Sequence, residues 1–224
     1  RDVTERKRAE NNLLEIARGV SATTGESFFH SLVAHLARVL EADFTFVGEL
    51  LPGRTDRVHS IAMQALGAPA DNFEFDLAGT PCENVFGQHT CIYPSGVQQL
   101  LAPDHLLAKM GVEACVGTPL FDTAGNSLGL MVVMFRRPIA LTEPVSSTLQ
   151  IFAARAAAEL ERVRTEQALR DSEARYRNIV ETAQEGIWQI DADNRTTFVN
   201  QQMADMLGYT VEAMHGRLLF DFMD

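Results

Sequence analysis

Apolar residues recur at steps of three and four near the start of the chain, and the positions between them are mostly charged or polar. This spacing predicts a helix with one narrow apolar face. A wider apolar stripe between Phe29 and Leu40 predicts another helix after it. A narrow apolar face needs a partner, which we expect to be this second helix or a second copy of the chain. The apolar positions of the first helix are Ala9, Leu13, Ile16 and Val20.

The apolar period changes to two from Phe44 onward, as expected for strands with one buried face. The last two of these strands are apolar on both faces and flank the loop 122–126. They therefore predict a hairpin in the middle of a sheet that is covered on both sides. The expected strands are residues 44–50, 57–66, 73–77, 113–121 and 128–135.

A long helical pattern follows at residues 143–184. Its apolar face rotates between Val163 and Leu169, where one step of six residues interrupts the steps of three and four. A continuous helix of this length extends about 60 Å, more than a small domain can cover. We expect its first three turns to pack on the sheet and the rest to form a dimeric coiled coil. The apolar positions are Leu149, Phe152, Ala156, Leu160, Val163, Leu169, Tyr176, Ile179 and Ala183.

These two helices predict a homodimer. Their apolar faces are the parts of the pattern that one small domain would leave uncovered. The candidate interface residues are Leu13, Ile16, Val20, Leu149, Phe152, Leu160 and Val163.

Composition limits the class of protein. The chain has 224 residues, 46% of them hydrophobic, which suffices for one full core and part of a second. No apolar run approaches the roughly 18 residues that span a bilayer, and the polar start RDVTERKRAE differs from a signal peptide. We therefore expect a cytoplasmic chain without membrane contact. A formal net charge of -11 repels phosphate backbones, so we expect no nucleic-acid partner.

The order of the expected elements and two stretches of sequence resemble the GAF domain, a sensory module. The stretch GTPLFDTAGNSLGLMVVM, residues 117–134, is similar to the last hairpin of that family. Residues 78–111, from AGTPCENVFG onward, are similar to a GAF subgroup of bacterial sensor kinases and diguanylate cyclases. The resemblance implies an α+β fold with a central antiparallel sheet, flanking helices, and long signalling helices at both ends.

Both ends of the chain resemble PAS domains. The start, RDVTERKRAE, is similar to the Asp-x-Thr junction at which a PAS domain passes into a signalling helix, with Asp2 able to cap the helix and Arg6 able to pair with it. Residues 176–216 are similar to the first half of another PAS domain, which implies a partial PAS fold at the C-terminus. The matching positions are Gly186, Asp191, Asn200, Gly208, Tyr209 and Gly216.

These resemblances imply part of a longer sensor with the order PAS, GAF, PAS. The expected parts are the end of a PAS domain at 1–4, a signalling helix at 5–22, the GAF domain at 23–141, a connecting coiled-coil helix at 142–184 and an incomplete PAS domain at 185–224.

The stretch GTPCENVFGQHTC, residues 79–91, holds two of the three cysteines of the chain. Thr80-Pro81-Cys82-Glu83 fits a capping box, in which the Thr80 hydroxyl accepts from the Glu83 amide and the Glu83 carboxylate reaches back to Thr80. The start of a helix favours a thiolate at Cys82, whereas the adjacent Glu83 opposes it. In a GAF fold this region would form the wall of a ligand pocket. The candidate pocket residues are Cys82, Val85, Phe86, Cys91, Tyr93, Leu101, Leu106 and Met110.

The cysteines allow several interpretations. A zinc site would need His89 and Cys115 as well, because eight residues separate Cys82 from Cys91 instead of the usual two to four, and we expect no metal. A covalently attached bilin, as in phytochrome GAF domains, is not expected, because no cysteine has phytochrome-like surroundings. Structural packing in the pocket wall is the favoured interpretation, and a redox-sensitive thiol is the alternative. The sequence names no cofactor.

The resemblance implies a regulatory chain that is not an enzyme. Its GAF domain would sense a small molecule or redox state, and its dimeric helices would pass the change to a kinase or cyclase output domain outside this sequence. One alternative is a thiol enzyme of the free methionine-sulfoxide reductase type that uses Cys82, Cys91 and Cys115; another is a ligand-free dimerisation scaffold. The candidate pocket has few polar groups, which disfavours cyclic nucleotides because a phosphate needs donors.

Overall fold

The computed structural model of the protein describes residues 24–83, 90–100, 106–140 and 142–222. The chain divides between Val163 and Arg164 into two compact units, and each is described by itself. None of the described helices carries an apolar stretch that could cross a bilayer. Several sequence-based expectations lie outside the described residues: the first helix with Leu13, Ile16 and Val20, the PAS junction at Asp2 and Arg6, and the pocket candidates Val85, Phe86 and Leu101.

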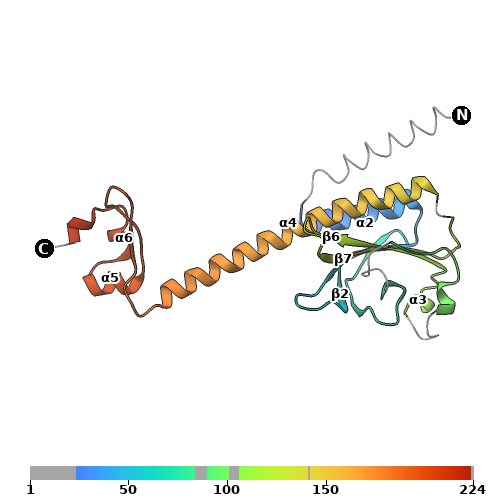
Figure 1. The fold of residues 1–224 in the computed structure, drawn as a ribbon, viewed down its shortest axis with the longest axis horizontal. Coiled ribbons are helices and arrows are strands. Elements are labelled where there is room, and N and C mark those ends of the chain that lie inside the picture. Colours follow the sequence, from blue (N-terminus) through green and yellow to red (C-terminus); the bar gives the residue numbers. More distant parts are fainter. Residues whose placement is uncertain (1–23, 84–89, 101–105, 141, 223–224) are drawn as a thin grey trace, which may run out of the picture. The chain divides into compact units, whose positions relative to one another are not determined.

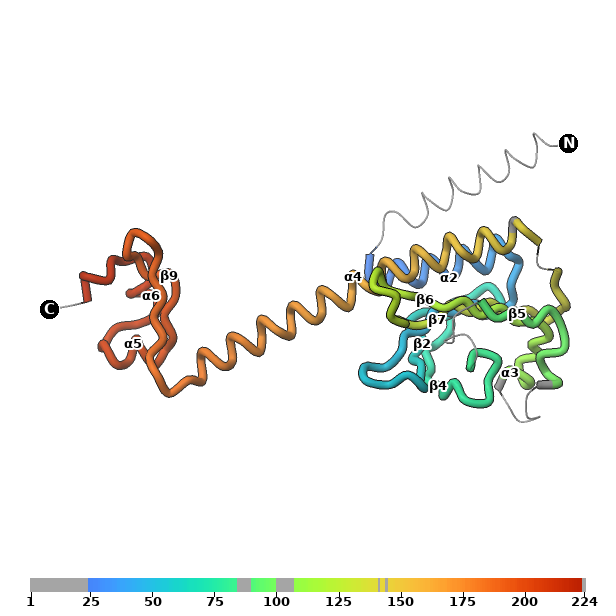
Figure 2. Tube along the Cα trace, in the orientation of Figure 1, coloured from blue at the N-terminus to red at the C-terminus, as the bar shows by residue number. Residues whose placement is uncertain are grey.

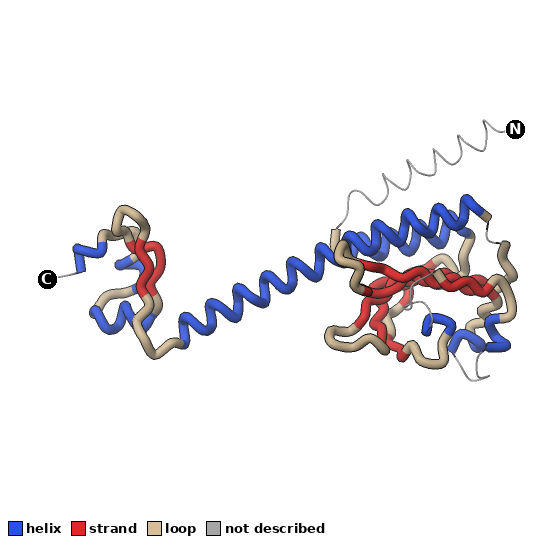
Figure 3. Tube along the Cα trace, in the orientation of Figure 1, coloured by secondary structure: helices blue, strands red, loops and turns tan. Residues whose placement is uncertain are grey.

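A seven-stranded antiparallel sheet forms the centre of the first unit (Figures 1 and 3), which confirms the expected α+β fold. The strands are β1 (Phe44–Leu50), β2 (Arg57–Ala65), β3 (Ala68–Ala70), β4 (Glu74–Asp76), β5 (Cys91–Tyr93), β6 (Ala114–Phe121) and β7 (Ser127–Phe135). Their order across the sheet is β3-β2-β1-β7-β6-β5, and β4 pairs with β2 off this path. The expected β6–β7 hairpin is confirmed. The third expected strand, residues 73–77, is shorter than its alternation suggested.

Two glycines let the middle strands of the sheet approach closely. Gly129 in β7 lies beside Gly48 in β1, and a side-chain carbon at position 129 would overlap the main chain there. A bulge in β2, opposite Val47 and Gly48, changes which side chains of β2 face each side of the sheet. Val58 therefore belongs to one core and Ala62 to the other.

Two helices cover one face of this sheet: α2 (Glu26–Leu40) and the first part of α4 (Glu143–Thr182) (Figure 1). The apolar stripe of α2 buries Leu32, Val33 and Leu36, as its spacing predicts. The helix ends at Glu41, whose backbone is left-handed and whose N–H donates to the Ala37 and Arg38 carbonyls. The core between helices and sheet also takes up Phe152, whose ring stacks on His35 at a centroid distance of 5.9 Å.

The helix α4 packs on the sheet over a longer stretch than expected. We expected three packed turns, but burial extends from Val145 to Leu160, which is about four turns. Placing Leu149, Phe152 and Leu160 at a dimer contact was therefore wrong, because contacts within one chain already bury them. Small residues explain the fit, since they let the helix approach the sheet and α2. They are Ala153, Ala156 and Ala157.

The opposite face of the sheet carries shorter segments. Figure 2 shows β4 and α3 (Leu106–Lys109) on the far side of the sheet from α2 and α4. The 3-10 helix η2 (Val97–Leu100) contributes Val97 to the same core. Cores on both faces explain why β6 and β7 are apolar throughout.

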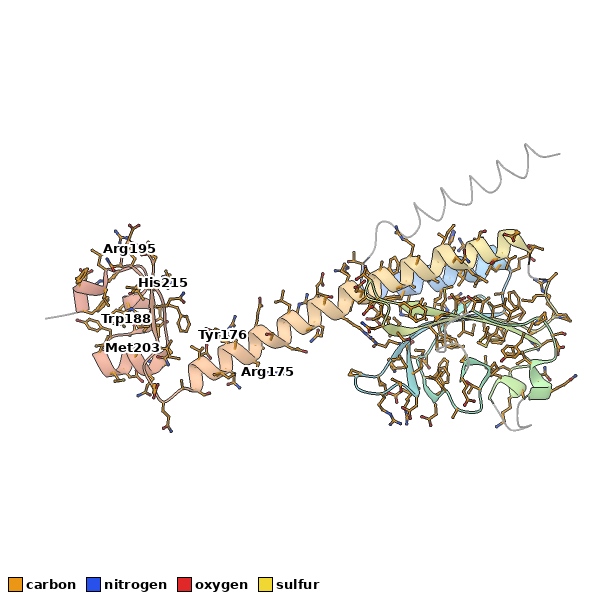
Figure 4. The ribbon with its side chains drawn as sticks, viewed as in Figure 1. Arg175, Tyr176, Trp188, Arg195, Met203 and His215 are labelled. Carbon is orange, nitrogen blue, oxygen red and sulfur yellow. The ribbon has the colours of Figure 1, made fainter. Side chains whose placement is uncertain are left out.

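The second unit holds the rest of α4, a two-stranded sheet and short helices. These elements are β8 (Trp188–Ile190), β9 (Thr196–Val199), α5 (Gln201–Leu207), α6 (Val211–Met214) and the 3-10 helix η3 (Leu219–Phe222). Trp188 and Met203, both labelled in Figure 4, pack against a small core of Val199, Ala204 and Met214. Met206, in the same helix as Met203, is 66% exposed and lies outside this core.

Asn200 organises the second unit. Its buried side chain donates to the carbonyls of Val180 and Glu185, and it accepts from the N–H groups of Ile187 and Met203. One side chain therefore ties the end of α4 to the residue before β8 and caps α5.

Candidate functional site

A cavity of about 570 Å³ lies on the face of the sheet opposite α2 and α4. The strands β1, β2, β6 and β7 supply one wall, and β4, the loop after it and α3 supply the other. Its size is within the range of pockets that hold small molecules and cofactors. The lining residues are Phe46, Met63, Asp71, Phe73, Glu74, Phe75, Asp76, Ala78, Thr80, Cys82, Leu107, Met110, Cys115, Val132 and Met134.

Three phenylalanine rings form an aromatic corner of the cavity. The ring of Phe46 meets those of Phe73 and Phe75 edge to face, at centroid distances of 5.3 and 5.9 Å. Phe73 and Phe75 lie 5.6 Å apart. They are brought to Phe46 because β4 pairs with β2, which places Phe75 opposite Val58. Such contacts hold the rings in fixed orientations.

Sulfur atoms make up much of the remaining wall. Cys115 and Met134 are direct partners across the β6–β7 hairpin, and both line the cavity. Methionine side chains are flexible and polarizable, so they adapt to the shape of an apolar ligand and make favourable contacts with aromatic rings. The sulfur-bearing lining residues are Met63, Cys82, Met110, Cys115 and Met134.

The capping box at Thr80 forms with its bonds shifted by one residue. The Thr80 hydroxyl accepts from the Cys82 N–H at 3.2 Å, not from Glu83. The Glu83 carboxylate accepts from the Gly79 N–H at 3.0 Å, not from Thr80. The 3-10 winding of residues 81–83 explains the shift, because a 3-10 turn is wound more tightly than an α-helix.

Burial, not a helix dipole, controls the cysteine thiols. Cys82 is 5% exposed, and burial raises its pKa to about 12. Burial also raises the pKa of Cys115 and of Cys91. The expectation that a helix start favours a Cys82 thiolate was wrong, because desolvation by the apolar surroundings disfavours any charge on this thiol.

Of the candidate pocket residues that the structure describes, some line the cavity and others lie outside it. Cys82 and Met110 line the cavity. Cys91 and Tyr93 lie in β5, at the edge of the sheet, where they pack against the same core but are not among the cavity lining. Leu106 is the first residue of α3. Among the described residues, no group of three or more His, Cys, Asp or Glu side chains has the arrangement of a metal site.

Sequence reasoning missed most of the cavity wall. The missed side chains lie in segments that the sequence predicts to be strands, and the period of two could have assigned each of them to one face of its strand. The pattern does not say which of these faces enclose a cavity. The missed residues are Phe46, Met63, Phe73, Phe75, Cys115, Val132 and Met134.

Two carboxylates fasten α4 to the first unit near the end of its packed part. The Glu159 carboxylate accepts from the Gly25 N–H at 2.6 Å, at the start of α2, and from the Arg162 guanidinium at 2.6 and 2.9 Å. Hydrogen bonding to Arg162, followed by the Gly25 amide, lowers the pKa of Glu159. The Glu161 carboxylate accepts from the hydroxyl and N–H of Thr123, in the β6–β7 turn. The cavity strands and α4 are thus joined directly.

Comparisons with known proteins identify both parts of the chain. The profile of the GAF domain family matches residues 24–160, and the profile of a PAS domain family matches residues 174–224. A methyl sulfide methyltransferase-associated sensor from Methanosarcina acetivorans is 30% identical over 105 residues, which are 46% of this chain and 10% of that sensor. The chain thus spans about a tenth of the length of this relative.

Solved structures agree on the fold. The GAF domain of a phosphoenolpyruvate-protein phosphotransferase from Coxiella burnetii has a TM-score of 0.56 at 18% identity, covering 71% of this chain and 96% of that one. Free methionine-R-sulfoxide reductase from Neisseria meningitidis has a TM-score of 0.56 at 16% identity, covering 70% and 91%. At these identities the likeness shows the fold alone.

Proposed function

Because the chain belongs to the GAF domain family, we propose that it is a sensory part of a signal-transduction protein, whose GAF domain binds a small molecule in the cavity beneath its sheet. The observation that carries this proposal is the placement of the cavity and α4 on opposite faces of one sheet. A ligand that changes the spacing of β6 and β7 acts on strands that α4 packs against. The PAS segment and the sensor-named relative support the same role.

The route of the signal is part of the proposal. Cys115, Val132 and Met134 face the cavity from β6 and β7, and the turn of that hairpin is bonded to Glu161 of α4. The helix then continues into the second unit, where Asn200 is bonded to its last turns. We infer that α4 passes the change to a kinase or cyclase output domain outside this sequence.

A homodimer through the second half of α4 completes the mechanism. Leu169, Tyr176 and Ile179 are 59%, 71% and 62% exposed, and their steps of seven and three residues suit a coiled-coil seam. Figure 4 shows Tyr176 projecting from the helix. This stripe takes the place of Leu149, Phe152 and Leu160 as the proposed contact.

The cavity favours a ligand-binding sensor over a ligand-free scaffold, because a scaffold needs an interior filled by its own side chains. A thiol enzyme is the second candidate, since Cys82 and Cys115 both line the cavity. The raised pKa of both thiols weighs against it, because a thiolate is the reactive form.

Native mass spectrometry of the purified protein tests the proposal. We expect a bound small molecule on the wild-type chain, and its loss in Val132→Phe, which places a ring into the cavity from β7. Phe121→Leu, at an exposed position outside the cavity, serves as the control and should keep the ligand. A Val132→Phe protein that is folded and still carries the same molecule would show that the ligand lies elsewhere.

A further inference from the structure

We propose that the ligand of this cavity is an uncharged aromatic molecule. The inference rests on the proposed function and names the class of ligand for the same site. The lining contains acidic residues, and carboxylates that pointed into the cavity would favour a cation. The class of ligand therefore depends on which lining residues turn their side chains toward the cavity.

The acidic residues of β4 turn their carboxylates to the other side of the sheet. In the β2–β4 pairing, Glu74 lies opposite His59 and Asp76 lies opposite Arg57. Directly opposed residues of antiparallel strands point to the same face. The Arg57 guanidinium lies 3.2 Å from the Glu74 carboxylate and 3.8 Å from that of Asp76.

The alternate residue of the same strand points into the cavity. Phe75 lies opposite Val58, and both belong to the core on the cavity side. Glu74 and Asp76 therefore border the cavity with their main chain, while Phe75 borders it with its ring. The strand presents aromatic surface inward and charge outward.

Among the described lining residues, Thr80 is also polar, and its hydroxyl is already engaged within the chain. The Thr80 hydroxyl donates to the Leu77 carbonyl at 2.7 Å and accepts from the Cys82 N–H. The thiols of Cys82 and Cys115 are buried and have raised pKa values, so they contribute no charge near neutral pH. Asp71, an exposed residue in the loop before β4, is the third acid among the lining residues that the structure describes, after Glu74 and Asp76.

A charged ligand would be costly in such a wall. An ion that leaves water needs a counter-charge or several hydrogen bonds, and the inward-facing side chains of the strands are two rings, two thioethers, one thiol and a valine. An aromatic ligand, in contrast, extends the edge-to-face contacts of Phe46, Phe73 and Phe75 and contacts the sulfur atoms.

Three compounds with one ring system test the charge preference: naphthalene, naphthalene sulfonate and a naphthyl trimethylammonium salt. Each competes with phenylnaphthylamine, an uncharged probe whose fluorescence rises in apolar sites. We expect naphthalene to displace the probe and the two ions to bind at least tenfold more weakly. Val132→Phe and Phe75→Leu should weaken probe binding, whereas Phe121→Leu should not. A thermal melt of each variant confirms that it is folded.

The outcomes separate this inference from the proposed function. If the sulfonate or the ammonium salt binds as tightly as naphthalene and loses its site in Val132→Phe, the cavity is a ligand site but the uncharged class is overturned. If no compound binds to the folded wild-type chain, the ligand site and this inference both fail. Probe binding that is unchanged in Val132→Phe and Phe75→Leu also overturns both, since the probe then occupies another surface.

Discussion

The Thr123 hydroxyl donates a 2.7 Å hydrogen bond to the Glu161 carboxylate, which joins the tip of the β6–β7 hairpin to α4. The Thr123 N–H donates to the same oxygen at 3.3 Å. The two residues are 38 positions apart in the sequence. Because the strands of this hairpin also carry Cys115 and Met134 of the cavity wall, the bond connects the candidate ligand site with the helix that leaves the unit.

A double-mutant cycle should detect this bond as a coupling between the two positions. We expect Thr123→Ala and Glu161→Ala each to lower the free energy of unfolding by about 1 kcal/mol, and the double variant to lose less than the sum. Urea unfolding provides the values. The matched cycle of Thr123→Ala with Glu173→Ala, further along α4, should be additive. Additive losses for Thr123 and Glu161 would contradict a direct connection.

The Glu159 contact should make stability depend on acid pH. Its folded-state pKa is lowered, so its stabilisation is complete above the ordinary pKa of a glutamate and is lost as the pH falls through the folded value. We expect Glu159→Gln to be about 1–2 kcal/mol less stable near neutral pH, with a difference that shrinks below about pH 4. Denaturation over this range measures the effect, and Glu181→Gln is the control. A constant difference would assign the loss to packing.

Cys91 should react with iodoacetamide before the other two cysteines. It lies partly exposed in β5, whereas Cys82 and Cys115 are buried; burial raises the pKa of all three thiols, that of Cys82 to about 12. Since the thiolate is the reactive form, both buried thiols should stay protonated and label slowly at pH values up to about 8. Peptide mass spectrometry after timed labelling gives the order, and Cys91→Ala should lose the fast phase. Labelling of Cys82 as fast as Cys91 would instead support a redox-sensitive thiol.

Substitutions in the two halves of α4 should have different effects. Leu160 is 2% exposed in the core of the first unit, so Leu160→Glu should lower the free energy of unfolding by about 4 kcal/mol or more. Leu169→Glu with Ile179→Glu should leave the melting temperature of that unit unchanged and convert a dimer to a monomer. Sedimentation at micromolar concentration distinguishes the two effects. A double variant that remains dimeric would exclude the exposed stripe as the contact.

The sequence by itself determined the local elements of this protein. The period of two at residues 44–50 and the doubly apolar runs around the loop 122–126 identified β1 and the β6–β7 hairpin, because a repeating pattern reflects local backbone geometry. The steps of three and four after Glu143 identified α4. The motifs within residues 78–134 also pointed to the correct family.

Only the tertiary structure decided what covers each face. The apolar pattern from Leu149 to Leu160 suits a coiled coil and a sheet-packing helix equally, and the choice depends on α2 and the sheet, which lie far away in the sequence. Phe46, Phe75 and Cys115 likewise line one cavity only because β1 pairs with β2 on one side and with β7 on the other, which joins β4 and β6 into the same sheet. The Cys82 thiol depends on the same distant contacts: the start of a helical turn favours its thiolate locally, but desolvation by the packed core outweighs that partial charge and raises the pKa.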